Sequence, residues 1–152
     1  MFQRLILSAA LMTGFNAFAT GAYSCKVVDH PDIKFSLALS VSHGMGSPIL
    51  NATGTVRVNP TDGAPAKSVY KIGKQSIPQY WNNDGAFNLG IYAERAGAAN
   101  STESVTVLIK TDFDEKASAY KGKFSIEYNW FEKTGWKSWK ATDLDVICEE
   151  VG

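Results

Sequence analysis

The densest group of residues that could bind a ligand lies near the C-terminus, where aromatic rings alternate with lysines. It comprises Trp130, Phe131, Lys133, Trp136, Lys137, Trp139 and Lys140. An indole ring offers a flat apolar face and one hydrogen-bond donor, which suits stacking on a sugar or anchoring a protein partner. The neighbouring ammonium groups could meet an anionic group of an acidic glycan or cell-wall polymer. We therefore predict a contact surface that includes Trp136, Lys137, Trp139 and Trp130.

A second interpretation assigns these rings to the protein's own sheet. Tryptophan favours strands, and aromatic pairs across neighbouring strands stabilise a sheet. Trp130 and Trp136 could face each other across a hairpin whose turn spans Glu132 to Gly135. Both interpretations stay open at the level of the sequence.

Metal chemistry finds little support in the residue spacing. The two histidines, His30 and His43, each stand beside turn residues, and no H-x-x-x-H or C-x-x-C spacing occurs. The acidic group Asp112, Asp114 and Glu115 lacks the glycine and the distal glutamate of a dedicated calcium loop. We interpret it as a solvated turn and expect neither a metal nor another cofactor.

Nucleophilic and acid–base catalysis lack recognisable motifs as well. No G-x-S-x-G elbow occurs, and the adjacent Ser42 and His43 would point to opposite faces of a strand. A glycosidase needs two carboxylates across a cleft, and the sequence pairs no two of its acidic residues. We expect a protein without catalytic activity, with a polysaccharide-acting enzyme as an alternative.

The N-terminus has the features of a secretion signal. Arg4 supplies the positive charge, an apolar run extends from Leu5 to Phe18, and Ala17-Phe18-Ala19 offers the small-x-small pattern of a cleavage site. The run is shorter than the roughly 20 residues that span a membrane. We predict a signal peptide at residues 1–19, one domain at residues 20–152, and a secreted or periplasmic protein without a transmembrane segment.

The charge of the predicted mature chain argues against nucleic acid as a partner. Without Arg4 it holds 14 basic and 15 acidic residues, so its net charge is close to −1. Proteins that bind nucleic acid usually carry a strongly basic surface. An unknown protein or glycan is the expected ligand, and the oligomeric state is undetermined.

Strands are predicted from end to end of this domain. Residues Ile33 to Ser42 alternate apolar with small or polar side chains, which is the period of a half-buried strand. The same alternation is centred on Phe87 to Ala93, Val105 to Ile109, Tyr120 to Trp130 and Leu144 to Cys148, with weaker runs at Tyr23 to Val28, Ala52 to Val58 and Ser68 to Ile72. Pro78 argues against a strand in Gln75 to Trp81, which leaves eight.

Cys25 and Cys148 connect the first predicted strand with the last. An exported chain enters an oxidising compartment, where two thiols are expected to form a disulfide. If successive strands are neighbours, this bond requires the sheet to curl until its terminal strands meet. We therefore predict an all-β fold, a small antiparallel β-barrel of about eight strands, with a two-sheet β-sandwich as the alternative.

The predicted plan is similar to small exported barrels of the lipocalin-like and avidin-like kind. The G-x-W signature expected near the first strand of a lipocalin is absent, because every tryptophan lies at Trp81 or beyond. The similarity is architectural and implies no ligand. The leading hypothesis is an exported binding or inhibitory module, and a self-assembling structural or envelope-associated protein is the alternative from another class.

Overall fold

The chain forms nine strands and one short helical turn. The computed structural model describes residues 20–42, 48–59, 68–83, 85–97, 102–132 and 134–151, so the predicted signal peptide, His43 and Lys133 lie outside the described residues. The elements are β1 (Thr20–Val27), β2 (Ile33–Ser42), β3 (Ile49–Val58), β4 (Ser68–Gly73), the 3-10 helix η1 (Lys74–Ser76), β5 (Gln79–Asn83), β6 (Ala86–Ala96), β7 (Thr102–Asp114), β8 (Ala119–Glu132) and β9 (Gly135–Glu150). No helix among the described residues is long and apolar enough to cross a membrane.

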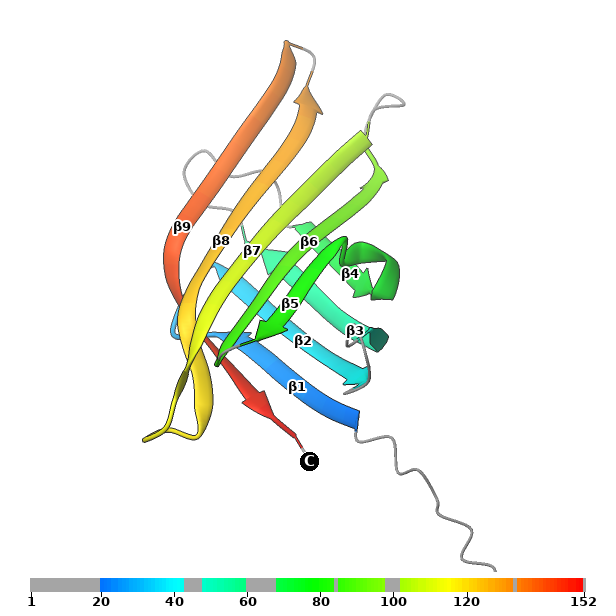
Figure 1. The fold of residues 1–152 in the computed structure, drawn as a ribbon. Coiled ribbons are helices and arrows are strands. Elements are labelled where there is room, and N and C mark those ends of the chain that lie inside the picture. The colour runs from blue at the N-terminus through cyan, green and yellow to red at the C-terminus, as the bar shows by residue number, and fades with distance from the viewer. Residues whose placement is uncertain are drawn as a thin grey trace, which may run out of the picture.

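All nine strands belong to a single antiparallel sheet that curls into a half-barrel (Figure 1). Its order is β4-β3-β2-β1-β9-β8-β7-β6-β5. Every neighbouring pair is consecutive in the chain except β1 and β9, which join the two ends of the chain at the centre of the sheet. The all-β prediction and the meeting of the terminal strands are thus confirmed.

The sheet opens between β4 and β5, although these strands follow each other in the chain. All neighbouring strands in the sheet are antiparallel, so the direction of the chain reverses from each strand to the next. In a sheet of nine strands the two edge strands, β4 and β5, therefore point the same way, and no hairpin can join them. The chain instead passes through η1, with β4 paired to β3 and β5 paired to β6. The prediction of eight strands was one short because Pro78 stands just before β5 rather than within it, where its missing N–H costs no ladder bond.

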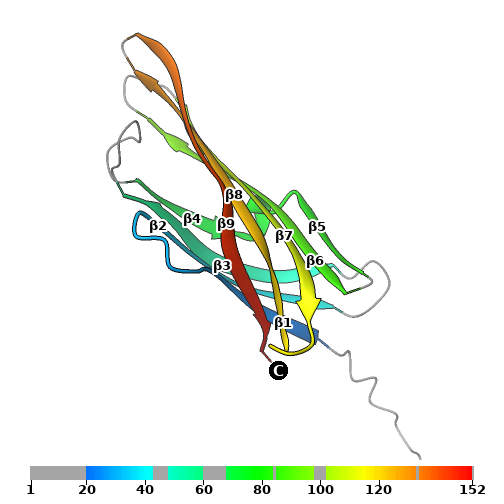
Figure 2. The same ribbon diagram turned by 90° about the vertical axis from the view of Figure 1, so that its left-hand side faces the viewer.

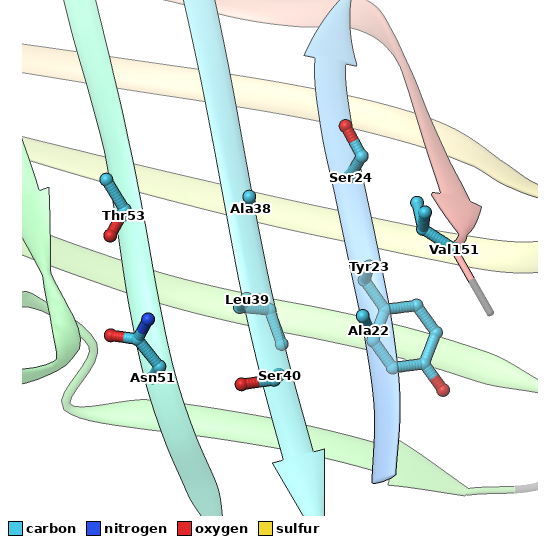
Figure 3. A pocket seen from close by; sticks show the side chains of 9 residues that line it. All are labelled: Ala22, Tyr23, Ser24, Ala38, Leu39, Ser40, Asn51, Thr53 and Val151. Carbon is cyan, nitrogen blue, oxygen red and sulfur yellow. The ribbon is translucent and has the colours of Figure 1, made fainter.

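Curling divides the sheet into two halves that enclose the core (Figure 2). Strands β1 to β4 form one half and β5 to β9 the other, and Figure 3 shows their ribbons crossing at a steep angle. The inward side chains follow the predicted alternation: in β2 the residues Ile33, Phe35, Leu37, Leu39 and Val41 are buried. The two halves meet through aromatic contacts, such as Phe35 with Phe124 at 5.1 Å between ring centroids.

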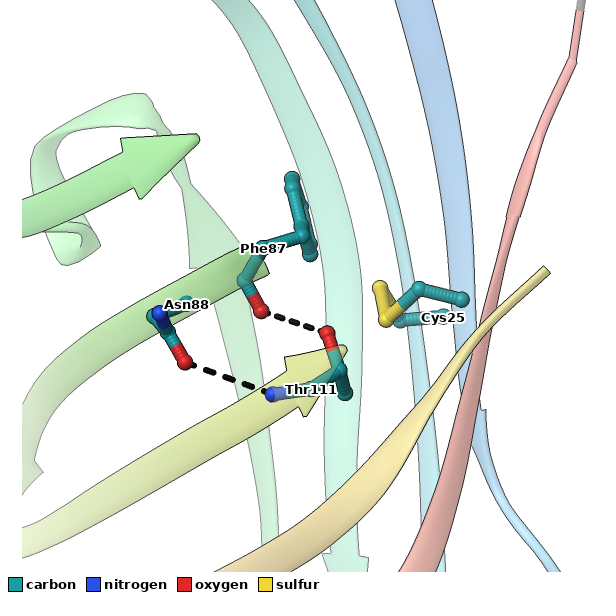
Figure 4. The surroundings of a disulfide bond; sticks show 5 residues. Cys25, Phe87, Asn88 and Thr111 are labelled. Atoms are coloured by element: carbon teal, nitrogen blue, oxygen red, sulfur yellow. Dashed lines mark hydrogen bonds between the residues drawn. A yellow bond between two sulfur atoms is a disulfide. The ribbon is translucent and has the colours of Figure 1, made fainter. Parts of the chain in front are cut away.

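A disulfide joins Cys25 and Cys148, as predicted. The two cysteines lie directly opposite each other on β1 and β9 and are fully buried. Figure 4 shows the neighbouring interior, where the buried Thr111 hydroxyl donates to the Phe87 carbonyl and the Thr111 N–H donates to Asn88 Oδ1 at 3.3 Å. Thr111 is the buried threonine of β7, and these two hydrogen bonds satisfy its hydroxyl and its N–H group.

Gly122 allows β8 to pass close to β7. A Cβ atom at this position would overlap the Lys110 carbonyl oxygen and would press on the Thr111 Cα. Glycine is therefore required at this point by close backbone approach rather than by an unusual backbone angle.

Candidate functional site

The hairpin of β8 and β9 reaches beyond the rest of the sheet and carries the predicted aromatic group. These are the longest strands of the molecule, with 14 and 16 residues. Their free end extends past the ends of the neighbouring strands (Figures 1 and 2). The hairpin end therefore presents side chains on both of its faces.

Phe131 and Trp136 form a pair on the outer face of this hairpin. They are opposite each other in the register, and their rings meet edge to face with centroids 5.7 Å apart. Trp136 is 64% exposed and Phe131 is 37% exposed. Trp136 has the highest exposed fraction of any large apolar side chain in the described part of the chain. Single exposed apolar side chains are common on proteins, whereas two neighbouring exposed rings are a candidate contact surface.

Trp130 and Trp139 lie on the inner face instead. Trp130 is 9% exposed, stacks on Tyr128 at 5.2 Å between centroids, and donates from Nε1 to Glu132 Oε1 at 2.9 Å. Trp139 lies opposite Tyr128 and packs against the core. The facing of Trp130 and Trp136 considered from the sequence does not occur, because the register pairs Trp136 with Phe131 and Trp130 with Lys137.

The structure thus divides the predicted contact residues between two faces. Trp136 shares the outer face with Phe131, whereas the exposed Lys137 shares the inner side with Trp130. A strand places successive side chains on opposite faces, so neighbours in sequence cannot form one flat surface. Phe131, which the sequence analysis placed in the aromatic group but not among the contact residues, is the ring that extends the Trp136 surface.

A cluster of polar side chains occupies the interior next to the hairpin, and the sequence analysis missed it. We call Ser68, Tyr70, Arg95, Glu103 and Tyr128 the seam cluster, because it connects β4 with β6, β7 and β8 where the sheet is open. Arg95 Nη2 lies 2.6 Å from Glu103 Oε2, and the Tyr128 hydroxyl donates to the same carboxylate at 2.8 Å. Arg95 also donates to Ser68 Oγ at 3.1 Å and to the Val69 carbonyl at 3.4 Å.

The charges of the seam cluster are compensated inside it. Arg95 lies over the Tyr70 ring at 4.7 Å, so its cation also meets an aromatic face. Burial, reinforced by the neighbouring Tyr128, raises the pKa of Tyr70 far above its ordinary value. Because the ion pair and the hydrogen bonds of Arg95, Glu103 and Tyr128 join β4 to β6, β7 and β8, we interpret the seam cluster as a structural connection across the open seam.

The acidic group near the end of β7 also has a structural role. Asp114 Oδ1 accepts hydrogen bonds from the N–H groups of Lys116 and Ala117, and its Oδ2 pairs with Lys121 Nζ at 2.9 Å. The Lys121 ammonium and these turn N–H groups lower the pKa of the carboxyl. The carboxylate thus closes the β7–β8 turn, and no group of three or more metal-binding side chains occurs among the described residues.

A shallow depression lies on the outer face of β1, β2 and β3 (Figure 3). Its volume is about 510 Å³, and Ala22, Ser24, Ala38, Ser40, Asn51, Thr53 and Val151 are among the residues that line it. The small side chains of Ala22 and Ala38 create the hollow, and hydroxyl and amide groups surround it (Figure 3). Most of its lining is apolar, with the hydroxyl and amide groups placed among the apolar side chains.

No protein-family model, curated protein or solved structure matches this chain.

Proposed function

We propose that the protein is an exported binding module without catalytic activity, which captures a protein partner through the outer face of the β8–β9 hairpin. The observation that supports this most is the 64% exposure of Trp136 at the projecting end. Partly exposed tryptophans beside a second ring are frequent anchors of protein interfaces. The edge-to-face geometry of Phe131 and Trp136 favours a protein over a sugar, because two perpendicular rings do not form one flat stacking platform.

Export is supported by two features. The disulfide between Cys25 and Cys148 suits an oxidising compartment outside the cytoplasm. The sequence before β1 has the charge, the apolar run and the small residues of a cleavable signal. Secretion and periplasmic residence are both compatible with these features.

The test is to compare the wild-type protein with a Trp136→Ala variant as immobilised baits. A partner retained by the wild type should bind at least about 30-fold more weakly to the variant, because truncating a central aromatic anchor costs roughly 2 kcal/mol or more. The thermal midpoint should change little, since Trp136 makes its ring contact with Phe131 at the surface. Quantitative mass spectrometry identifies the partner, and calorimetric titration of the purified pair measures the affinity.

Trp81→Ala provides a matched control. Trp81 is another exposed tryptophan, with 44% exposure, on the edge strand β5. Its truncation should leave capture intact. Equal loss in the two variants, or capture that survives Trp136→Ala, contradicts the proposal.

The alternative of a self-assembling structural protein is favoured by one observation. β5 is an edge of the sheet and is paired only with β6, and an open edge can pair with a second chain. Light scattering on the purified protein without added ligand distinguishes the two. Growth of large particles supports assembly, whereas a stable small species supports the binding module.

A further inference from the structure

Four basic side chains gather on the outer face of β1 to β4, one from each strand. We call Lys26, Lys34, Arg57 and Lys71 the basic quartet; all four are exposed. In the register Lys34 lies opposite Arg57, Lys71 lies opposite Thr55, and Lys26 lies opposite Ser36. Neighbouring strands are about 4.8 Å apart, so the quartet spans about 15 Å across the sheet.

Two hydroxyl groups stand at the centre of the basic quartet. Ser36 and Thr55 are opposite each other on β2 and β3, and their hydroxyl oxygens lie 3.3 Å apart. Lys71 and Lys26 flank this pair in the same row, and Arg57 and Lys34 occupy the next row. Cations around hydroxyl donors form a suitable arrangement for an oxyanion such as a sulfate or a carboxylate.

The positive charge of the basic quartet is not neutralised by ion pairs with the described residues. None of its members forms an ion pair with a described residue, whereas Arg95, Lys121, Lys123 and Lys140 in the other half each pair with a carboxylate. No acidic residue occurs in β1 to β4. Like charges opposite each other on a sheet are unfavourable, so the juxtaposition of Lys34 and Arg57 indicates an anion supplied from outside.

Acidic residues lie at the border of this face but do not neutralise its positive charge. Asp32 precedes Lys34 by two positions, and Glu149 on β9 lies opposite Ser24. Neither makes an ion pair with the basic quartet. The positive charge is therefore concentrated in two adjacent rows of residues across the strands, the row that contains Arg57 and the row that contains Thr55.

The depression of Figure 3 continues the same surface. The row that contains Thr53, Ala38 and Ser24 follows the row of Thr55 and Ser36 along the strands. A chain that binds an anionic group at the basic quartet would thus extend over the hollow lined by Ser24, Ser40 and Asn51. The hydroxyl and amide groups there can exchange hydrogen bonds with neutral sugar hydroxyls.

The side chains of this face favour one class of polyanionic partner over the others. The aromatic residues of β1 to β4 are Tyr23, Phe35 and Tyr70, and all three are buried. Bases of a single-stranded nucleic acid usually stack on exposed rings, and no described aromatic ring of β1 to β4 is exposed. We propose that the outer face of β1 to β4 binds an extended acidic polysaccharide, with its anionic groups on the basic quartet and its neutral hydroxyls over the depression.

The test measures binding of the purified, disulfide-bonded protein to heparin and to polygalacturonate, with neutral dextran as the uncharged comparison. Wild-type protein should bind both acidic polymers, and the affinity should fall steeply with added salt. The double variant Lys34→Gln, Arg57→Gln should bind about tenfold more weakly, because each exposed charge contact contributes a factor of a few. A variant Ala38→Gln, which fills the depression, should weaken binding while leaving the salt dependence unchanged, since no charge is altered.

The control is Lys110→Gln with Lys116→Gln, which removes the same net charge from exposed positions on β7 and the following turn. It should change the affinity by less than about twofold. Equal weakening in the control overturns the proposal, because the binding would then depend only on net charge. Tighter binding to double-stranded DNA or to phosphatidylglycerol vesicles than to either polysaccharide also overturns it. Trp136→Ala should leave polysaccharide binding unchanged, so this surface is tested independently of the hairpin.

Discussion

Tyr23 makes one of the connections between the two halves of the sheet. Its ring stacks on Phe87 at 4.5 Å between centroids, and its hydroxyl accepts a hydrogen bond from Asn82 Nδ2 at 2.8 Å. β1 is thereby tied to β5 and β6 across the core. Burial raises the pKa of Tyr23 from 10.0 to about 12, with Glu150 contributing in the same direction.

This raised pKa predicts a loss of stability in alkali. Above pH 10 the unfolded chain releases the Tyr23 proton while the folded chain retains it, so the free energy of unfolding should fall from pH 10 to about pH 12. Urea unfolding at a series of pH values measures the fall, and the ultraviolet absorbance of tyrosinate follows the ionisation.

Tyr23→Phe supplies the comparison. Phenylalanine has no proton to release, so the variant should show a shallower alkaline decline. A variant whose decline is as steep as that of the wild type would assign the effect to other groups, such as Tyr70 and Tyr80, whose pKa values are also raised by burial.

Arg95 and Glu103 show how much of the interior could be predicted from strand periodicity. The inward positions Leu89, Ile91 and Ala93 continue to Arg95 on β6, and the inward positions Val107 and Val105 continue back to Glu103 on β7. A charge on the apolar face of each of these consecutive strands was the available signal for a partly buried ion pair. The partners Ser68 and Tyr70 could not be predicted, since they come from the opposite edge of the sheet.

At the level of elements, the seam cluster replaces the backbone ladder that β4 and β6 do not form. Arg95 reaches from β6 to the Val69 carbonyl and the Ser68 hydroxyl on β4. Side chains therefore hold the open seam at this end.

Arg95→Met should weaken this connection. Its loss leaves Glu103, whose side chain is 17% exposed, and Tyr128 without their cation. We expect the free energy of unfolding to fall by about 1–2 kcal/mol, a value reduced for the partial exposure of Arg95. Urea unfolding measures the change, and amide hydrogen exchange in β4 should accelerate.

Lys121→Met removes a cation from an exposed ion pair and serves as the control. Its effect on the free energy of unfolding should be much smaller, and exchange in β4 should be unaltered. Equal effects of the two substitutions would contradict a specific role of the seam cluster.

Strand positions were predicted well where one face of the strand is buried and the other is exposed to solvent. The boundaries Ile33 to Ser42 agree with β2, because strict alternation continues along its whole length. β5 was missed, since its five residues lie beside Pro78, although it pairs with β6, its neighbour in the sequence. The hairpin register of Trp136 with Phe131 depended on the turn geometry at Gly135, where φ is 117°, and this conformation was not evident from residue types.

For the molecule as a whole, the disulfide reinforces the centre of the sheet. The two cysteines are separated by 123 positions and lie where β1 meets β9. The bond therefore closes almost the entire domain into one loop. The sequence could predict this pairing because the chain contains only two cysteines.

Replacing both cysteines by alanine should strongly destabilise the fold. In the chain-entropy model the cross-link of so long a loop contributes about 4–5 kcal/mol. The free energy of unfolding of Cys25→Ala, Cys148→Ala should decrease by a comparable amount in urea, and reduction of the wild type should have a similar effect. A variant as stable as the oxidised wild type would show that β1 and β9 need no covalent link.

The opening between β4 and β5 has a consequence for how the chain could be rearranged. The Val151 N–H donates to the Ala22 carbonyl at 2.7 Å, so the last strand ends beside the beginning of the first. A short linker could fuse Val151 to Thr20, and new termini could be cut within η1. Such a circular permutant would run from one margin of the sheet to the other without a crossing, as an unbroken meander in which chain order and spatial order coincide.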